Sequence, residues 1–207
     1  MKNDQKIIYP IFSKVVYTSN TKTENKEIIN ILEETKIKKF KKVPPASSMS
    51  EDVHVLDSNN LKSLKKMLEL EIKHYVNGFL KYKNKFKITT SWFTRTGKNG
   101  FSNYHNHSNS MFSGCFYIKA DSETDKISFV NHSLPTWVLD PEEKNIYNGE
   151  KMEFGVYPGF LIMFPSEVFH KILPNINNKE RLSLAFNIIP TGNIGYSDSS
   201  LNLIKCK

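Results

Sequence analysis

The sequence has few cysteines and no long apolar run, and each shortage excludes a class of protein. Only two cysteines occur, Cys115 and Cys206, so a disulfide framework is excluded and free thiols in a reducing cytoplasm are expected. No apolar stretch approaches the ~20 residues that a membrane-spanning helix needs. No signal-peptide segment follows the first residues either. We therefore expect a cytoplasmic protein that does not enter the membrane.

Acidic residues are also scarce, because 21 Asp and Glu accompany 29 Lys and Arg, which gives a net charge of +8. Such a charge attracts anionic substrates and is compatible with nucleic-acid binding. The lysines are spread along the chain, however, and richness in Lys, Asn and Ile is a bias that AT-rich coding sequence also produces. We therefore do not expect a nucleic-acid partner. The net positive charge favours an anionic substrate only slightly.

The composition is typical of one globular domain, which we expect to span residues 1–207. Hydrophobic residues make up 39% and aromatic residues 12% of the chain, enough for a sizeable core. Three parts follow one another: a strand with supporting helices at 1–84, a β-rich core at 85–190 and a tail at 191–207. The tail is rich in Gly, Ser and Asn and is expected to be loosely held.

The first part is predicted to contain one strand and two helices. A run of β-branched and aromatic residues predicts a strand at 7–18. Apolar residues at three- and four-residue steps predict helices at 24–40 and 59–80. The segment 43–49, which includes Pro44-Pro45, is expected to be a loop.

The second part is a series of short strands separated by turn residues. Segments rich in β-branched and aromatic residues lie at 86–95, 111–119, 126–130, 151–156, 160–164, 168–173 and 181–190. Such a series indicates a sandwich or barrel. We therefore predict a mainly β (α+β) protein, a double-stranded β-helix or cupin-like jelly roll buttressed by the N-terminal helices.

Three histidines are candidate metal ligands. His105 and His107 are separated by one residue, so on a strand both side chains point to the same face and can bind one ion. His170 lies 63 residues after His107, on another predicted strand. Imidazole suits iron, zinc, copper or nickel, so the residue type alone does not fix the metal. A solvated surface histidine or a satisfied core histidine is the alternative at each position.

Arg181 is a candidate for binding an acid. It shares one face of the predicted strand with Ser183 and Asn187. An arginine on the inner face of a sandwich is costly unless an anion meets it, and its planar fork matches a carboxylate. Either a bound acid, helped by the Ser183 hydroxyl, or a buried Asp or Glu of the chain itself would satisfy it.

Together these segments resemble the 2-oxoglutarate/Fe(II)-dependent oxygenases, in particular a branch common in marine phages and bacteria. That family carries a His-x-Asp/Glu pair, a distal histidine and, shortly after it, an arginine. The segments that carry the resemblance are His105 to Tyr117, Phe164-Pro165-Ser166 with His170, and Arg181 to Asn187. It covers most of the chain from residue 85 and, more weakly, the helical part.

The resemblance implies the cofactors and the roles of individual residues. It makes His105 and His170 ligands of Fe(II), with His107 as the third candidate ligand. The residues that it implies for binding the cosubstrate 2-oxoglutarate are Arg181, Ser183, Tyr117, Asn103 and Asn187. The implied reaction is hydroxylation of a small molecule or a protein side chain, with release of succinate and CO2. A phage-encoded protein of this branch would act in the host cytoplasm.

His107 departs from the family pattern, which usually has Asp or Glu there. Either three histidines bind the metal, or a carboxylate arrives from elsewhere, or His107 only supports the ligands. Three neutral ligands leave iron with one more positive charge than two histidines and a carboxylate, which alters its redox potential.

Two other functions remain open. One is a three-histidine dioxygenase of the cupin type that does not use 2-oxoglutarate. The other is a non-enzymatic jelly-roll binding or structural protein that keeps a vestigial metal site, since this fold hosts many functions. The sequence does not set the oligomeric state, and a homodimer is compatible with it.

Overall fold

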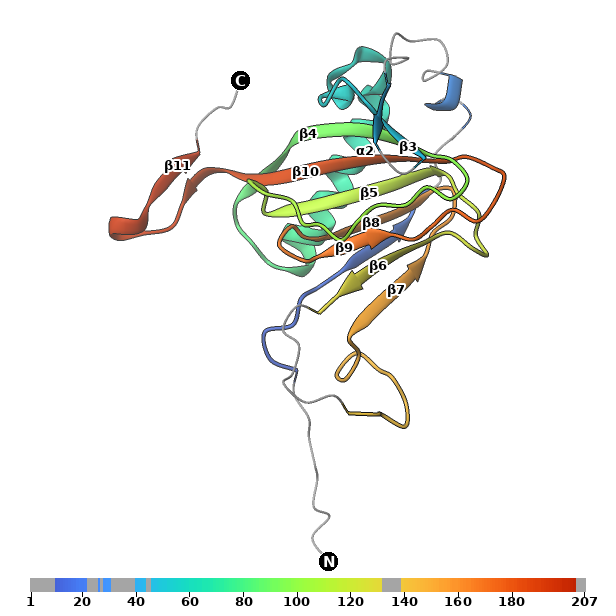
Figure 1. Cartoon of the computed structure of the whole chain (residues 1–207). Helices are drawn as coiled ribbons and strands as arrows, with labels where there is room; N and C mark the ends of the chain where they lie inside the picture. The colour runs from blue at the N-terminus through green and yellow to red at the C-terminus, as the bar shows by residue number, and fades with distance from the viewer. Residues whose placement is uncertain are drawn as a thin grey trace, which may run out of the picture.

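The computed structural model describes residues 10–21, 26, 28–30, 40–43, 46–131 and 139–203. Within them the chain forms two antiparallel β-sheets that face each other, with one long helix against the larger sheet (Figure 1). The predicted mainly β jelly roll with supporting helices is confirmed. No helix in these residues is long and apolar enough to cross a membrane.

The larger sheet has the strand order β1-β8-β5-β10-β4-β3-β2, with β11 paired to β10. Its strands are β1 (Tyr17–Asn20), β2 (Phe40–Val43), β3 (Ser47–Ser50), β4 (Lys85–Thr96), β5 (Phe112–Lys119), β8 (Phe160–Pro165), β10 (Arg181–Ile194) and β11 (Leu201–Leu203). The smaller sheet has the order β7-β6-β9. Its strands are β6 (Lys126–Val130), β7 (Lys151–Gly155) and β9 (His170–Ile172). Strand β10 lies at the centre of the larger sheet and carries the candidate site residues Arg181, Ser183 and Asn187.

The helical elements between β3 and β4 cover the outer face of the larger sheet (Figure 1). They are the 3₁₀ turns η1 (Val55–Asp57) and η2 (Asn59–Leu61), the helix α2 (Lys62–Lys73) and the π-helical turn η3 (His74–Phe79). Leu64, Leu68 and Ile72 form the buried stripe of α2, at the four-residue spacing that places side chains on one helix face. They pack against alternate residues of the strands, such as Leu184 and Phe186, and form the main core.

The inner face of the larger sheet looks toward the smaller one and encloses a second apolar cluster. Its buried members are Cys115, Tyr117, Ile127, Phe129, Val156, Phe160, Ile162 and Phe164. Because successive strand residues alternate between faces, Arg181, Ser183 and Asn187 of β10 point into this interior, next to Tyr117 of β5. The candidate site therefore lies between the two sheets.

Some predicted boundaries differ from the structure. The opening strand forms at Tyr17–Asn20, after the predicted start; residues 10–16 are not strand, and Phe12 has a φ of 55°, which extended backbone does not allow. The predicted loop at 43–49 is wrong at Val43, which ends β2, and over Ser47 to Met49, which belong to β3 and pair with β2 and β4.

Two other elements are confirmed only in part. Residues 26 and 28–30 of the predicted first helix are helical, while 31–39 lie outside the described residues and Phe40 already begins β2. The tail is not a loose segment throughout, since β10 continues to Ile194 and pairs with β11 in a projecting arm (Figure 1).

A substitution of Gly114 in β5 tests how tightly the outer face of the larger sheet is packed. A Cβ at this position would collide with the ring of Phe186, which is fully buried on the neighbouring strand and cannot move aside. We expect Gly114→Ala to lower the free energy of unfolding by about 1–3 kcal/mol, the usual cost of overpacking a core. Urea denaturation measures the change.

Gly155→Ala in β7 is the matched control, because a Cβ there would meet no atom within 4 Å. Its expected effect is within about 0.5 kcal/mol. Equal effects of the two substitutions would contradict the close approach of Gly114 and Phe186.

Candidate functional site

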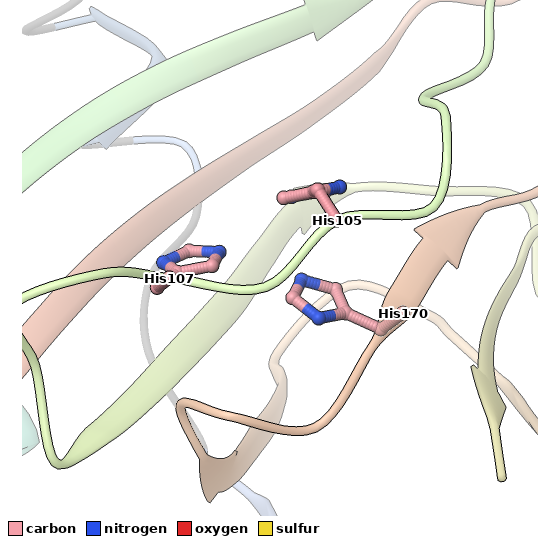
Figure 2. A group of neighbouring side chains, drawn as sticks. All are labelled: His105, His107 and His170. Carbon is pink, nitrogen blue, oxygen red and sulfur yellow. The ribbon is translucent and has the colours of Figure 1, made fainter. Parts of the chain in front are cut away.

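Three histidines converge at one end of the interior. His105 and His107 lie in the segment between β4 and β5, and His170 begins β9. One ring nitrogen from each histidine lies within 4.8 Å of the other two. Figure 2 shows the three imidazoles close to one another. The predicted convergence is therefore present, and the three side chains could hold one metal ion.

Backbone hydrogen bonds hold the two chain segments together. The amide of His105 donates to the carbonyl of His170 at 3.0 Å, and the amide of His170 donates to the carbonyl of His105 at 2.9 Å. The amide of His107 donates to the carbonyl of Ser166 at 3.0 Å. His105 thus forms an isolated bridge with His170, and the pair lies in a loop rather than in a regular strand as predicted.

The second nitrogen of each imidazole is already bonded, and this fixes which nitrogen faces a metal. The Nδ1 atoms of His105 and His170 lie 2.9 Å from the carbonyl of Asn103 and 3.1 Å from that of Val168. Nδ1 of His107 lies 2.6 Å from Oδ1 of Asn187. These oxygens can only accept, so each Nδ1 carries the proton and donates it. Each Nε2 then keeps a lone pair for a metal, the arrangement that orients metal-binding histidines in proteins.

Burial keeps two of these imidazoles neutral. Burial is the largest cause that lowers the pKa of His170 to about 3, and the neighbouring His105 and His107 contribute to the same shift. Burial also lowers the pKa of His107, opposed by its hydrogen bond to Asn187. A metal binds only the neutral imidazole. At pH 7 neither His107 nor His170 needs to release a proton before binding.

Asn187 is joined to a network that fixes His107. Its Oδ1 also accepts from the hydroxyl of Ser113 at 2.9 Å, and its Nδ2 donates to the hydroxyl of Thr90 at 3.0 Å. The ring of Trp92 lies on the other side, stacked on His107 with 5.7 Å between ring centroids. Because Asn187 is neutral, it orients His107 without making the imidazole a more negative ligand.

Arg181 lies further along β10 and is buried, with 2% of its surface exposed. Its Nη1 donates to Oδ1 of Asp125 at 2.6 Å, and its Nη2 donates to the carbonyl of Leu173 at 3.2 Å. The sequence left two partners possible for Arg181, a bound acid or an acidic residue of the chain itself. The structure shows the second, Asp125. Asp125 is a functional candidate that the sequence did not single out, because one acidic residue before a strand gives no distinctive signal.

The interior beside Arg181 contains an unsatisfied polar atom. The hydroxyl of Tyr117 is buried and has no hydrogen-bond partner in the described part of the chain. Burial and the adjacent Cys115 raise the pKa of Tyr117 well above its usual value, so its hydroxyl stays protonated and able to donate. Ser183 is the cross-strand neighbour of Tyr117. A buried donor without a partner costs free energy, and a ligand oxygen beside Arg181 would recover it.

The structure brings most of the predicted site residues into this interior. Asn103 is the exception, because its side chain is exposed and only its backbone carbonyl contacts His105. Trp92 was not predicted as a site residue; only its pairing with Ala185, on the inner face of β10, places it beside His107. Trp137, which the sequence also suggests for a substrate-binding loop, and His132 lie outside the described residues.

The part of the chain that forms this site matches a known protein family. Residues 90–187, which include every inner-face residue discussed above, match the family described as "Putative 2OG-Fe(II) oxygenase". No curated protein matches the sequence.

Solved structures share the fold at low sequence identity. An oxidoreductase of the 2OG-Fe(II) oxygenase family from Burkholderia pseudomallei is 12% identical, with a TM-score of 0.58 over 80% of this chain and 77% of that one. HygX from Streptomyces hygroscopicus, solved with nickel and 2-oxoglutarate bound, is 11% identical, with a TM-score of 0.60 over 85% and 83%. A prolyl-4-hydroxylase from Pseudomonas putida is 14% identical, with a TM-score of 0.57 over 83% and 91%.

Proposed function

We propose that His105, His107 and His170 bind Fe(II) together. The match of residues 90–187 to the 2OG-Fe(II) oxygenase family supports this proposal. Arg181 then receives the far carboxylate of 2-oxoglutarate. The observation that carries the proposal is the set of three imidazoles that each donate through Nδ1 and keep Nε2 for a metal.

The donor set fits the metal. Imidazole is a suitable ligand for iron, and three ligands on one side of an ion leave its other positions open. Bound Fe(II) with 2-oxoglutarate and molecular oxygen would supply oxidative decarboxylation, in which one oxygen atom of O2 enters succinate as CO2 leaves and the other oxidises the substrate. With three neutral ligands the site keeps the full charge of the ion, which favours the carboxylate of an incoming keto acid.

The polar groups of the interior also suit the far carboxylate of the cosubstrate. A carboxylate beside Arg181 would accept from the guanidinium and from the unpartnered hydroxyl of Tyr117. Ser183, next to Tyr117 on the adjacent strand, would add a second hydroxyl. Arg181 and Asn187 are on the same face of β10, so one molecule lying along this strand would reach from the histidines toward the guanidinium.

Aromatic side chains around the histidines would exclude water from the reaction. The ring centroid of Phe164 lies 4.5 Å from that of His170, and the centroid of Phe129 lies 5.9 Å from it. Trp92 covers His107. These rings bury His107 and His170 and would shield a bound cosubstrate, while exposed His105 lies on the side open to solvent.

The substrate is a small molecule or a protein side chain. Its chemistry would be set by loops at the mouth of the interior. The net charge of +8 favours an anionic substrate.

An anaerobic titration tests the proposal. Fe(II) and then 2-oxoglutarate are added to metal-free protein while the visible spectrum is recorded. We expect a charge-transfer band only when both are present, because the band reports chelation of the keto acid at the iron. Succinate release then screens for substrates.

Two other results would each replace the proposal. Bound iron without the band would indicate a three-histidine dioxygenase of the cupin type, a function that the three-histidine cluster itself favours. Failure to bind iron would indicate a binding protein with a vestigial site.

A further inference from the structure

Asp125 is fixed in position by bonds that do not involve Arg181. Its Oδ2 accepts from the amide of Asp121 at 2.8 Å. Its own amide donates to the carbonyl of Asp121 at 3.0 Å, and its carbonyl accepts from the amide of Val156 at 3.0 Å. The carboxylate is therefore part of the turn that precedes β6. A ligand that enters the interior would therefore approach an Asp125 carboxylate whose position is already fixed.

The ion pair leaves much of the guanidinium available. One N–H of Arg181 donates to Asp125 and one to Leu173, while an arginine has five. Both side chains of the pair are almost fully buried, at 2% and 3% exposure. Three donors, with the hydroxyl of Tyr117 nearby, remain for a second carboxylate.

The charges of the ion pair affect how strongly that second carboxylate binds. Arg181 and Asp125 sum to zero, so a carboxylate that joins them makes the cluster negative. In a buried site the repulsion between two carboxylates is weakly screened. An unpaired arginine would attract the same ligand without this opposing term.

We propose that Asp125 sets the affinity for the cosubstrate by repelling its far carboxylate when that carboxylate binds Arg181. The inference rests on the proposed function. Asp125 weakens the binding of 2-oxo acids that carry a second carboxylate and leaves those without one unaffected. It thereby shifts the concentration range over which the protein responds to 2-oxoglutarate.

Asp125→Asn in the Fe(II)-loaded, oxygen-free protein tests whether the carboxylate of Asp125 repels the far carboxylate of the ligand. The asparagine keeps the size of the side chain and removes its charge. We expect 2-oxoglutarate to bind about tenfold more tightly, the effect of removing one neighbouring like charge. Binding of 2-oxopentanoate, which has the same chain length without the far carboxylate, should change less than about twofold. Both affinities are read from titrations of the charge-transfer band and from calorimetry.

Asp121→Asn is the matched control. It removes a negative charge four residues away, from a partly exposed side chain whose Oδ1 accepts from Glu123 and Thr124 rather than from Arg181. Both affinities should stay at the parental values.

The possible failures can be told apart. Weaker or unchanged binding of 2-oxoglutarate by Asp125→Asn would overturn the inference, because Asp125 would then orient Arg181 or play no part. Equal tightening of both 2-oxo acids would also overturn it, since the far carboxylate would not be involved. A parental protein that binds iron but neither keto acid would instead contradict the proposed function.

Unfolding of the variant is excluded by a second measurement. Asp125→Asn leaves the buried charge of Arg181 without its partner, so the ligand-free variant should melt below the parent. Saturating 2-oxoglutarate should raise its melting temperature more than it raises that of the parent, because the ligand restores a counter-charge. An equal or smaller rise would count against the inference.

Discussion

His170→Ala is expected to abolish iron binding, with a loss of affinity larger than about 100-fold. Loss of a residue that merely orients a metal ligand already costs about 10–100-fold, and His170 is proposed as a ligand itself. It is also the most buried of the three histidines, at 4% exposure, and the one whose backbone pairs with His105. Equilibrium dialysis of the anaerobic protein against Fe(II) measures the affinity directly.

His74→Ala is the control for this substitution. His74 is an exposed histidine in η3, outside the three-histidine cluster, so its removal should leave the iron affinity unchanged. Circular dichroism must show that the His170 variant is folded, because the side chain packs against Phe164 and Phe129. A folded His170→Ala protein with parental iron affinity would exclude the three-histidine centre.

The strands of the core could be predicted from sequence because their patterns are local. The predicted segments 126–130 and 160–164 agree with β6 and β8 within one residue, since both strands contain several β-branched or aromatic residues. The segment Ser47–Ser50 has no such residues. It becomes β3 because the neighbouring strands supply hydrogen bonds on both sides, and this pairing depends on the tertiary structure.

The convergence of the three histidines could be predicted, but for a partly mistaken reason. His105 and His107 were expected to point the same way because they lie two apart on a strand, but they belong to a loop. The convergence comes from backbone hydrogen bonds to Ser166 and His170, distant in sequence. The bonds of the three Nδ1 atoms depend equally on segments brought together by folding, so they could not be read from the spacing of the histidines.

Arg181 shows the limit of such reasoning most clearly. Its alternation with Leu182 and Leu184 correctly placed it on the inner face of the sheet. A buried guanidinium requires a negative partner, but its identity depends on which acidic residue the fold brings close. Asp125 lies 56 residues earlier in the chain, and nothing in its local sequence marks it as that partner.

The buried pair makes Arg181 critical for stability as well as for binding. We expect Arg181→Met to lower the free energy of unfolding by about 3–5 kcal/mol, because it leaves the Asp125 carboxylate buried without a counter-charge. Urea denaturation of the metal-free protein measures this loss. Lys65→Met is the control, because Lys65 pairs with Asp57 at the surface, and its removal should cost less than about 1 kcal/mol.

The double variant Arg181→Met/Asp125→Asn separates the two roles of the arginine. Removing both charges should recover most of the stability that Arg181→Met loses, since neither ion is then buried alone. The recovered fold should still bind Fe(II), because the three histidines and their Nδ1 partners are unchanged. It should bind 2-oxoglutarate no better than 2-oxopentanoate, having lost the group that recognises the far carboxylate. If this folded variant still preferred 2-oxoglutarate, Arg181 would be only the structural partner of Asp125, and another residue would bind the cosubstrate.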